Sequence, residues 1–271
     1  ILITVIPLIA LQIRAVSDTA FLLSPQAVQG SLAIGFCVII TLFSILFGTS
    51  RRAGRTQYDG LVMAIAFESL VKLIAFLVVG AFAVYGAFGS FDGLDLWLQE
   101  QPELVASLKN TDYFSSFHVM VLLFFTAAVA MPHMFYVTLT GNNGQKALSF
   151  ASWGLPLYFL LLSLPVLPIL WAGLQSGSSV QVEYFPIVIG AAYQVPMISL
   201  LAYLGGLSAA SGLIIVITLA LSNMCLNHLI LPIYQPKANE DIYRWLLWKR
   251  RALITAIIWL GFLFHYLPSE Q

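Results

Sequence analysis

The chain has 271 residues, of which 60% are hydrophobic and only 9% are charged. A soluble domain of this size with that composition would have a largely apolar surface, so the sequence excludes a soluble protein and indicates an integral membrane protein. The formal net charge is zero, which gives no basic footprint for nucleic acid. No phosphate-binding loop, metal-spaced Cys and His group or nucleophile elbow indicates an enzyme in these residues.

Long apolar runs alternate with short polar connections, which predicts an all-α, polytopic transmembrane bundle that forms a single domain over residues 1–271. A helix needs about 20 apolar residues to cross a bilayer. Basic residues gather in alternate connections, and this bias marks the cytoplasmic side. We expect about seven spans, at about 1–23, 26–48, 58–88, 112–140, 146–174, 198–231 and 245–267.

The first span begins ILITVIPLIALQ, without Met or a charged lead. We therefore expect a fragment, or a chain whose start has been trimmed. Arg14 and Asp18 stand four residues apart in this span, on one helix face. The spacing fits an ion pair near the outer end, and it also fits an Arg14 side chain that extends to the interface by itself.

The third span holds Glu68 and Lys72, again four residues apart, deep in an apolar run. A single charge there would cost several kcal/mol. Because Glu precedes Lys by four residues, the two can neutralise each other. Three interpretations stay open: a structural ion pair that faces other helices, a proton or substrate relay, and neutralised groups that do not interact.

Two connections are expected at the membrane surface. Residues 90–111 are amphipathic and acidic, too polar to span, with Trp97 at the interface. The segment EYFPIVIGAAYQVP is apolar but short and bounded by prolines, which predicts a re-entrant or surface helix.

The fourth span, DYFSSFHVMVLLFFTAAVAMPHMFYVTLT, is interrupted near its middle by Pro132, and His133 follows directly. Proline removes a backbone hydrogen bond and clashes with the carbonyl four residues earlier. Protein, water or a ligand must satisfy the freed carbonyls in lipid. A broken span of this kind is typical of a transporter binding site. The alternative is a kinked helix without a ligand.

The sixth span contains GGLSAASG, whose small residues allow neighbouring helices to approach closely. Ser208 and Ser211 are three residues apart and share a face. Their hydroxyl oxygens, together with backbone carbonyls, would suit a hard monovalent cation. The alternative is tight helix packing in which each hydroxyl bonds to a carbonyl of its own helix.

Three segments in this order resemble the sodium/solute symporter family. They are GRTQYDGLVMAIAF in the third span, the Pro-His break in MPHMFYVTL, and the small-residue helix LSAASGLIIVITLALSNMCLNHLI. The resemblance covers nearly the whole chain and implies a five-plus-five inverted-repeat transporter fold, with the seven spans as core helices three to nine. It also implies that core helices one, two and ten, and with them part of the family's sodium site, lie outside these residues.

The resemblance further implies which residues meet ion and solute. The family's adjacent hydroxyl pair falls on Ser211 and Gly212, so one hydroxyl is missing and Ser208 becomes the substitute. The coupling ion is therefore expected to be Na⁺, or H⁺ through Glu68, His133 or Lys72. The family's aromatic positions on the broken helix fall on Phe124 and Ala128. The expected solute-binding set is Phe124, Ala128, Pro132 and His133.

FESLVK together with MPHMFYVTLTGN is similar to the symporter-like membrane domain of bacterial sensor histidine kinases. This implies a multi-pass protein of the bacterial cytoplasmic membrane, with a small amino-acid-like solute as its partner and a kinase domain beyond residue 271. The expected function is ion- or proton-coupled solute transport without a further cofactor. The alternatives are a solute-sensing input domain that transports little and a structural subunit of a membrane complex.

Overall fold

The computed structural model describes residues 2–24, 26, 28–48, 56–109, 114–131, 145–233 and 242–266. Nearly all of these residues are helical, and none of those described lies in a strand, which confirms the all-α class. Within these described ranges, four stretches are long and apolar enough to cross a bilayer, judged by length and composition. They are Thr4–Leu23, Met63–Ala87, Ser149–Gln175 and Pro196–Ile233.

In the three other predicted spans, the described residues form helices, but none of these contains a described stretch of that length and apolarity. In α2 (Gln29–Gly48) and α6 (Phe114–Ala130), the apolar stretches are Gly30–Leu46 and Phe117–Thr126. Helix α13 (Ile242–His265) is 24 residues long and includes the basic run KRR. The count of seven and the inverted repeat therefore remain predictions.

The chain forms two compact units. One consists of Ile1–Lys72 and Tyr203–Gln271, and the other of Leu73–Ala202. Two helices contribute residues to both: α3 (Thr56–Phe82) and α11 (Pro196–Cys225).

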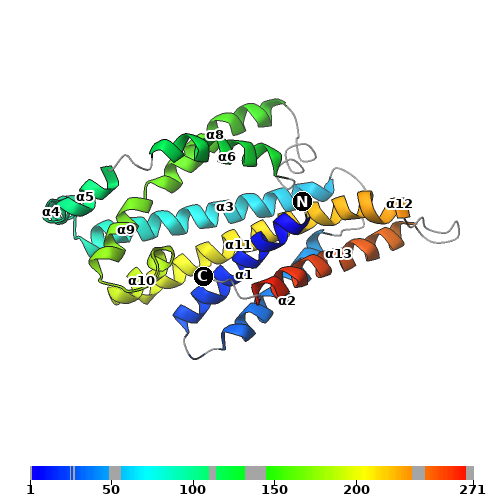
Figure 1. Ribbon diagram of the computed structural model, residues 1–271, viewed down its shortest axis with the longest axis horizontal. Coiled ribbons are helices and arrows are strands. Elements are labelled where there is room, and N and C mark those ends of the chain that lie inside the picture. The colour runs from blue at the N-terminus through cyan, green and yellow to red at the C-terminus, as the bar shows by residue number, and fades with distance from the viewer. Residues whose placement is uncertain are drawn as a thin grey trace. The chain divides into compact units, whose positions relative to one another are not determined.

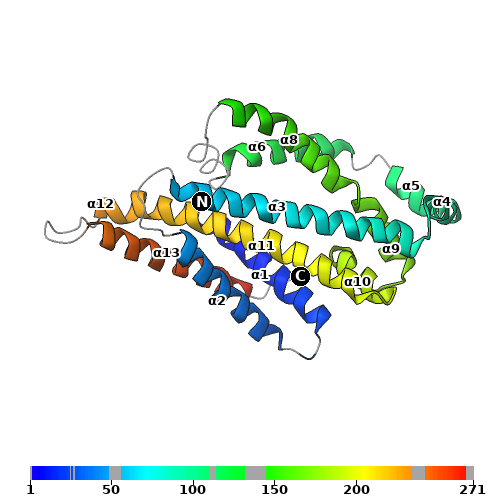
Figure 2. The ribbon, with the colours of Figure 1, turned by 180° about the vertical axis from the view of Figure 1, so that it is seen from behind.

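The first unit is a helical bundle in which α1 (Leu2–Leu23), α2 and α13 pack against one another (Figure 1; Figure 2). Its core also takes residues from α11. Branched aliphatic side chains dominate this core, and their few rotamers pack densely at low entropic cost. The largest side chains that are fully buried there are Ile9, Ile13, Ile214, Ile217, Ile254 and Ile258.

The second unit has a smaller core formed by the end of α3, α9 (Val166–Gln175) and α10 (Phe185–Ala192). A π-helical turn, η1 (Ala83–Ala87), extends α3 into this core. Close approach depends on glycine, because a Cβ at Gly80 would overlap Pro165 and a Cβ at Gly173 would overlap the Phe185 ring. The buried members are Val79, Ala83, Ile169, Ala172, Phe185 and Ile189.

The predicted surface segment 90–111 forms two short helices, α4 (Phe91–Glu100) and α5 (Pro102–Lys109). Ser90 caps α4, and its Oγ accepts a hydrogen bond from the backbone N–H of Gly93 at 3.1 Å. Helix α10 has eight residues and follows a 3₁₀ turn, η3 (Val182–Tyr184), so it is too short to cross a bilayer.

The long fifth and sixth spans are not regular helices throughout. The fifth divides into α8 (Gln145–Ser163) and α9, with Leu164 and Pro165 at the division, because proline cannot continue the hydrogen-bond ladder. In the sixth, α11 passes into a π-helical turn, η4 (Leu226–Ile230), and then into α12 (Leu231–Ile233).

The core of the first unit gives a test on one helix. Ile13 is fully buried in α1, whereas Leu11 is 59% exposed. We expect Ile13→Ala to lower the free energy of unfolding by about 3 kcal/mol, because it leaves a cavity. Leu11→Ala should cost less than about 1 kcal/mol, because that side chain fills no core space. Unfolding of the purified protein in detergent measures both variants, and equal losses would contradict this core.

Candidate ion and solute site

A pair of charged side chains on α3 forms the first part of the candidate site. Lys72 Nζ lies 3.7 Å from Glu68 Oε1, one helical turn away. Only 16% of the Glu68 side chain and 31% of the Lys72 side chain are exposed. Both lie in the apolar stretch Met63–Ala87. The two groups therefore interact as an ion pair, and the interpretation of separate, non-interacting groups does not hold.

Helix α11 contacts this pair with the small residues of GGLSAASG. The Ser208 hydroxyl donates a long hydrogen bond, 3.4 Å, to the backbone carbonyl of Glu68. A Cβ added at Gly212 would overlap the Glu68 carboxylate, so that carboxylate lies directly on the backbone of α11. Ser208 and Gly212 are four residues apart and share one face of α11. The structure thus brings together two features that lie 140 residues apart in the chain.

Ser211, the other predicted ion ligand, behaves differently from Ser208. Its hydroxyl donates to the Ser208 carbonyl of its own helix at 2.9 Å. This is the local bond that serine and threonine commonly make inside helices. Ser208 thus bridges two helices, whereas Ser211 satisfies its hydroxyl within α11. Of the two hydroxyls, it is that of Ser208 that contacts Glu68.

The electrostatics of the contact are simple, because α11 has no Asp, Glu, Lys, Arg or His in its 30 residues. Among the described residues, the charge paired with the Glu68 carboxylate is the Lys72 ammonium on the same helix. In an apolar environment each of these charges is stabilised mainly by the other, since little solvent is available to either. A change in the charge of one group therefore changes the stability of the other.

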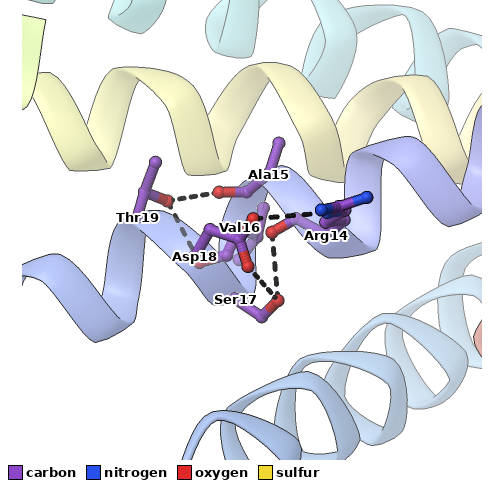
Figure 3. Close-up of polar contacts among 6 residues, drawn as sticks. All are labelled: Arg14, Ala15, Val16, Ser17, Asp18 and Thr19. Carbon is purple, nitrogen blue, oxygen red and sulfur yellow. Dashed lines mark hydrogen bonds and ion pairs between the residues drawn. The ribbon is translucent and has the colours of Figure 1, made fainter. Parts of the chain in front are cut away.

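A second ion pair lies on α1 (Figure 3). Arg14 Nε is 3.6 Å from Asp18 Oδ2, so the ion-pair interpretation holds for these residues. The buried Ser17 hydroxyl donates to the Arg14 carbonyl at 3.0 Å and lies 3.5 Å from Asp18 Oδ1 (Figure 3). Half of the Arg14 side chain is exposed. All of these contacts stay within one helix.

The expected solute-binding set lies on and after α6. This helix ends at Ala130, two residues before the proline that was expected to break it, and Met131 forms a bend. Phe124 is 69% exposed, so no described side chain closes a pocket around it. Ala128 belongs to α6, but its side chain is outside the described part of the chain. Pro132 and His133 also lie outside the described residues.

The contact between Gly212 and the Glu68 carboxylate is not predicted by the residue patterns of the sequence. Ser208 and Gly212 form a small-xxx-small pair, the spacing that marks close approach between membrane helices. That spacing could have identified the contact face of α11, but not the residue opposite. Among the described residues, no group of three or more His, Cys, Asp or Glu side chains could hold a metal ion.

The contact at Gly212 predicts a sharp difference between two glycines of α11. Gly212→Ala should lower the free energy of unfolding by about 2 kcal/mol, because the new methyl group displaces the Glu68 carboxylate. Gly206→Ala is the matched control, since a Cβ there meets nothing within 4 Å. It should change stability by less than about 0.5 kcal/mol.

Thermal unfolding of both variants, and of both in a Glu68→Ala, Lys72→Ala background, measures this difference. The penalty at Gly212 should shrink in that background, because the group it displaces is gone. If Gly212→Ala lowers the stability no more than Gly206→Ala does, the Glu68 carboxylate does not lie against Gly212.

Comparison of the chain with protein-family models, with curated proteins and with solved structures finds no match.

Proposed function

We propose that this chain is the membrane domain of a secondary transporter for a small polar solute, amino-acid-like in chemistry. In this proposal the domain is a multi-pass protein of the bacterial cytoplasmic membrane, and transport is coupled to Na⁺ or H⁺. The observation that supports it is the Glu68–Lys72 ion pair, which lies against α11 at Ser208 and Gly212 in an apolar helix.

The physical cost of that arrangement argues for a function. Ionisable residues inside membrane helices are expensive and usually mark ion or substrate pathways. A hydrophobic pair of similar volume would stabilise a passive scaffold at least as well, since buried ion pairs rarely add net stability. The pair meets α11 through the Ser208 hydroxyl and the Gly212 backbone, and α11 itself carries no charged residue.

Each residue of the site takes a role in this proposal. Glu68 and Lys72 form the charge relay, and Ser208 with Ser211 supplies hydroxyl oxygens for the coupling ion. The solute would contact the broken fourth span through Phe124, Ala128, Pro132 and His133. This last assignment rests on the family resemblance and on the proline in the sequence.

Uptake by the full-length protein in sealed proteoliposomes tests transport directly. A panel of radiolabelled amino acids is offered with an imposed sodium gradient, with an imposed proton gradient and with neither. We expect gradient-dependent accumulation of at least one solute above protein-free vesicles. Saturable binding of a solute without accumulation would contradict transport and favour a sensing domain. Neither binding nor uptake under any gradient would contradict both.

Charge neutralisation in the relay gives a second test. Glu68→Gln leaves the Lys72 ammonium without its partner in an apolar stretch, so we expect a loss of stability of about 3 kcal/mol and at least a tenfold slower uptake. Glu100→Gln, at an exposed position at the end of α4, removes the same charge and should leave both unchanged. Thermal unfolding and initial uptake rates are measured for both variants. Normal behaviour of Glu68→Gln would show that water, and not the Glu68 carboxylate, stabilises the Lys72 ammonium.

A further inference from the structure

We infer that the exposed face of α1 around Arg14 and Asp18 is an interface with a second copy of this chain, in which each Arg14 pairs with Asp18 of the other copy. The inference goes beyond the proposed function, because an interface between copies needs neither a solute nor a coupling ion. It predicts a dimer whose two-fold axis runs along the membrane normal.

The first step concerns the depth of Arg14 in the membrane. This residue lies at the middle of the 20-residue apolar stretch Thr4–Leu23, with about 14 Å of helix on either side. An arginine side chain is too short to extend from there to the membrane surface. Half of the Arg14 side chain is nevertheless exposed. Because charged residues inside membrane helices rarely face lipid, a further protein surface is expected to cover this part of α1.

The second step concerns the residues around Arg14. The opposite face of α1, with Ile13 and Val16, is buried in the core of the first unit. The exposed face is a stripe about 100° wide along the helix. Its members are exposed or partly exposed, and they are Leu11, Arg14, Ala15, Asp18 and Leu22. Ala15 has the smallest side chain of the stripe, and small residues allow membrane helices to approach closely.

The third step is the complementarity of this stripe with itself. Arg14 and Asp18 lie one turn apart along α1 and about 40° apart around it (Figure 3). If a two-fold axis passes between these positions in two parallel helices, Arg14 of each copy meets Asp18 of the other. No other partner is needed, because a second copy presents both signs of charge at matching positions.

The pair within each helix can persist in such a dimer. A guanidinium has five N–H donors, and one carboxylate engages two of them in a bidentate pair. Arg14 can therefore contact Asp18 of its own helix, now at 3.6 Å, and a second carboxylate as well. The four charges sum to zero, so the interface places no net charge in the apolar part of the bilayer.

Disulfide cross-linking of the full-length protein in proteoliposomes tests the interface. Ala15→Cys places a thiol within the stripe, and Ile39→Cys is the control, on α2 at a side chain that is 65% exposed. The native cysteines are buried, so the unmodified protein gives the background. With an oxidant, we expect Ala15→Cys to form a covalent dimer and Ile39→Cys to stay monomeric. No cross-link for Ala15→Cys, or equal cross-linking of both variants, would overturn the inference.

Charge exchange between two differently tagged copies tests the pairing. Arg14→Asp makes the stripe acidic and Asp18→Arg makes it basic, so each variant alone should dimerise about tenfold more weakly or worse. Co-expression of the two variants brings opposite charges together, and we expect the tags to co-purify as they do for the wild-type protein. Dimers that persist in either single variant, or that are lost and not restored by mixing, would contradict the inference.

Two other occupants of the stripe give different results at Ala15→Cys. A further segment of the full-length chain would leave the thiol monomeric and closed to a water-soluble maleimide. A water-filled cavity would leave it monomeric but open to that reagent. Either result overturns the inference, and this test stands even if a charge variant fails to fold. No readout here measures uptake, so a monomeric transporter or a dimer that transports nothing would separate the two proposals.

Discussion

The Glu68 carboxylate is held between an ammonium one turn further along α3 and the backbone of α11 at Gly212. This contact constrains both helices at once. Helix α11 must present a residue without a side chain, since even a methyl group would collide with the carboxylate. Helix α3 must keep Lys72 in place, since an uncompensated carboxylate in an apolar stretch is strongly destabilising. The small residues of α11 and the charges of α3 therefore depend on each other.

Much of the fold follows from local pattern. Apolar runs predict the helices, and Pro165 explains why the fifth span divides into α8 and α9. The acidic segment after the third span forms α4 and α5, as its amphipathic character predicts. The length of an apolar run in the sequence does not by itself decide whether a helix crosses a bilayer. Helix α13 is an example, because one continuous helix contains both the apolar run and several basic residues.

The site was predicted only in parts. The spacing of four residues predicts that Glu68 can meet Lys72, because both partners lie on one helix. The contact with Ser208 is different, since 140 residues separate the partners and no periodicity within either helix encodes it. From the spacing of their hydroxyls alone, Ser208 and Ser211 were predicted to play the same role. The structure separates them, because a serine bonds within its own helix unless a neighbouring carbonyl lies within reach.

The described residues of the first unit include two ion pairs with the same spacing, and the surroundings of these pairs differ. On α1, Ser17 serves both the Arg14 carbonyl and Asp18, and half of the Arg14 side chain is exposed. The contacts described there stay within one helix. On α3, a second helix approaches the anion so closely that only glycine fits. Changing a charge on α3 therefore alters the packing of two helices.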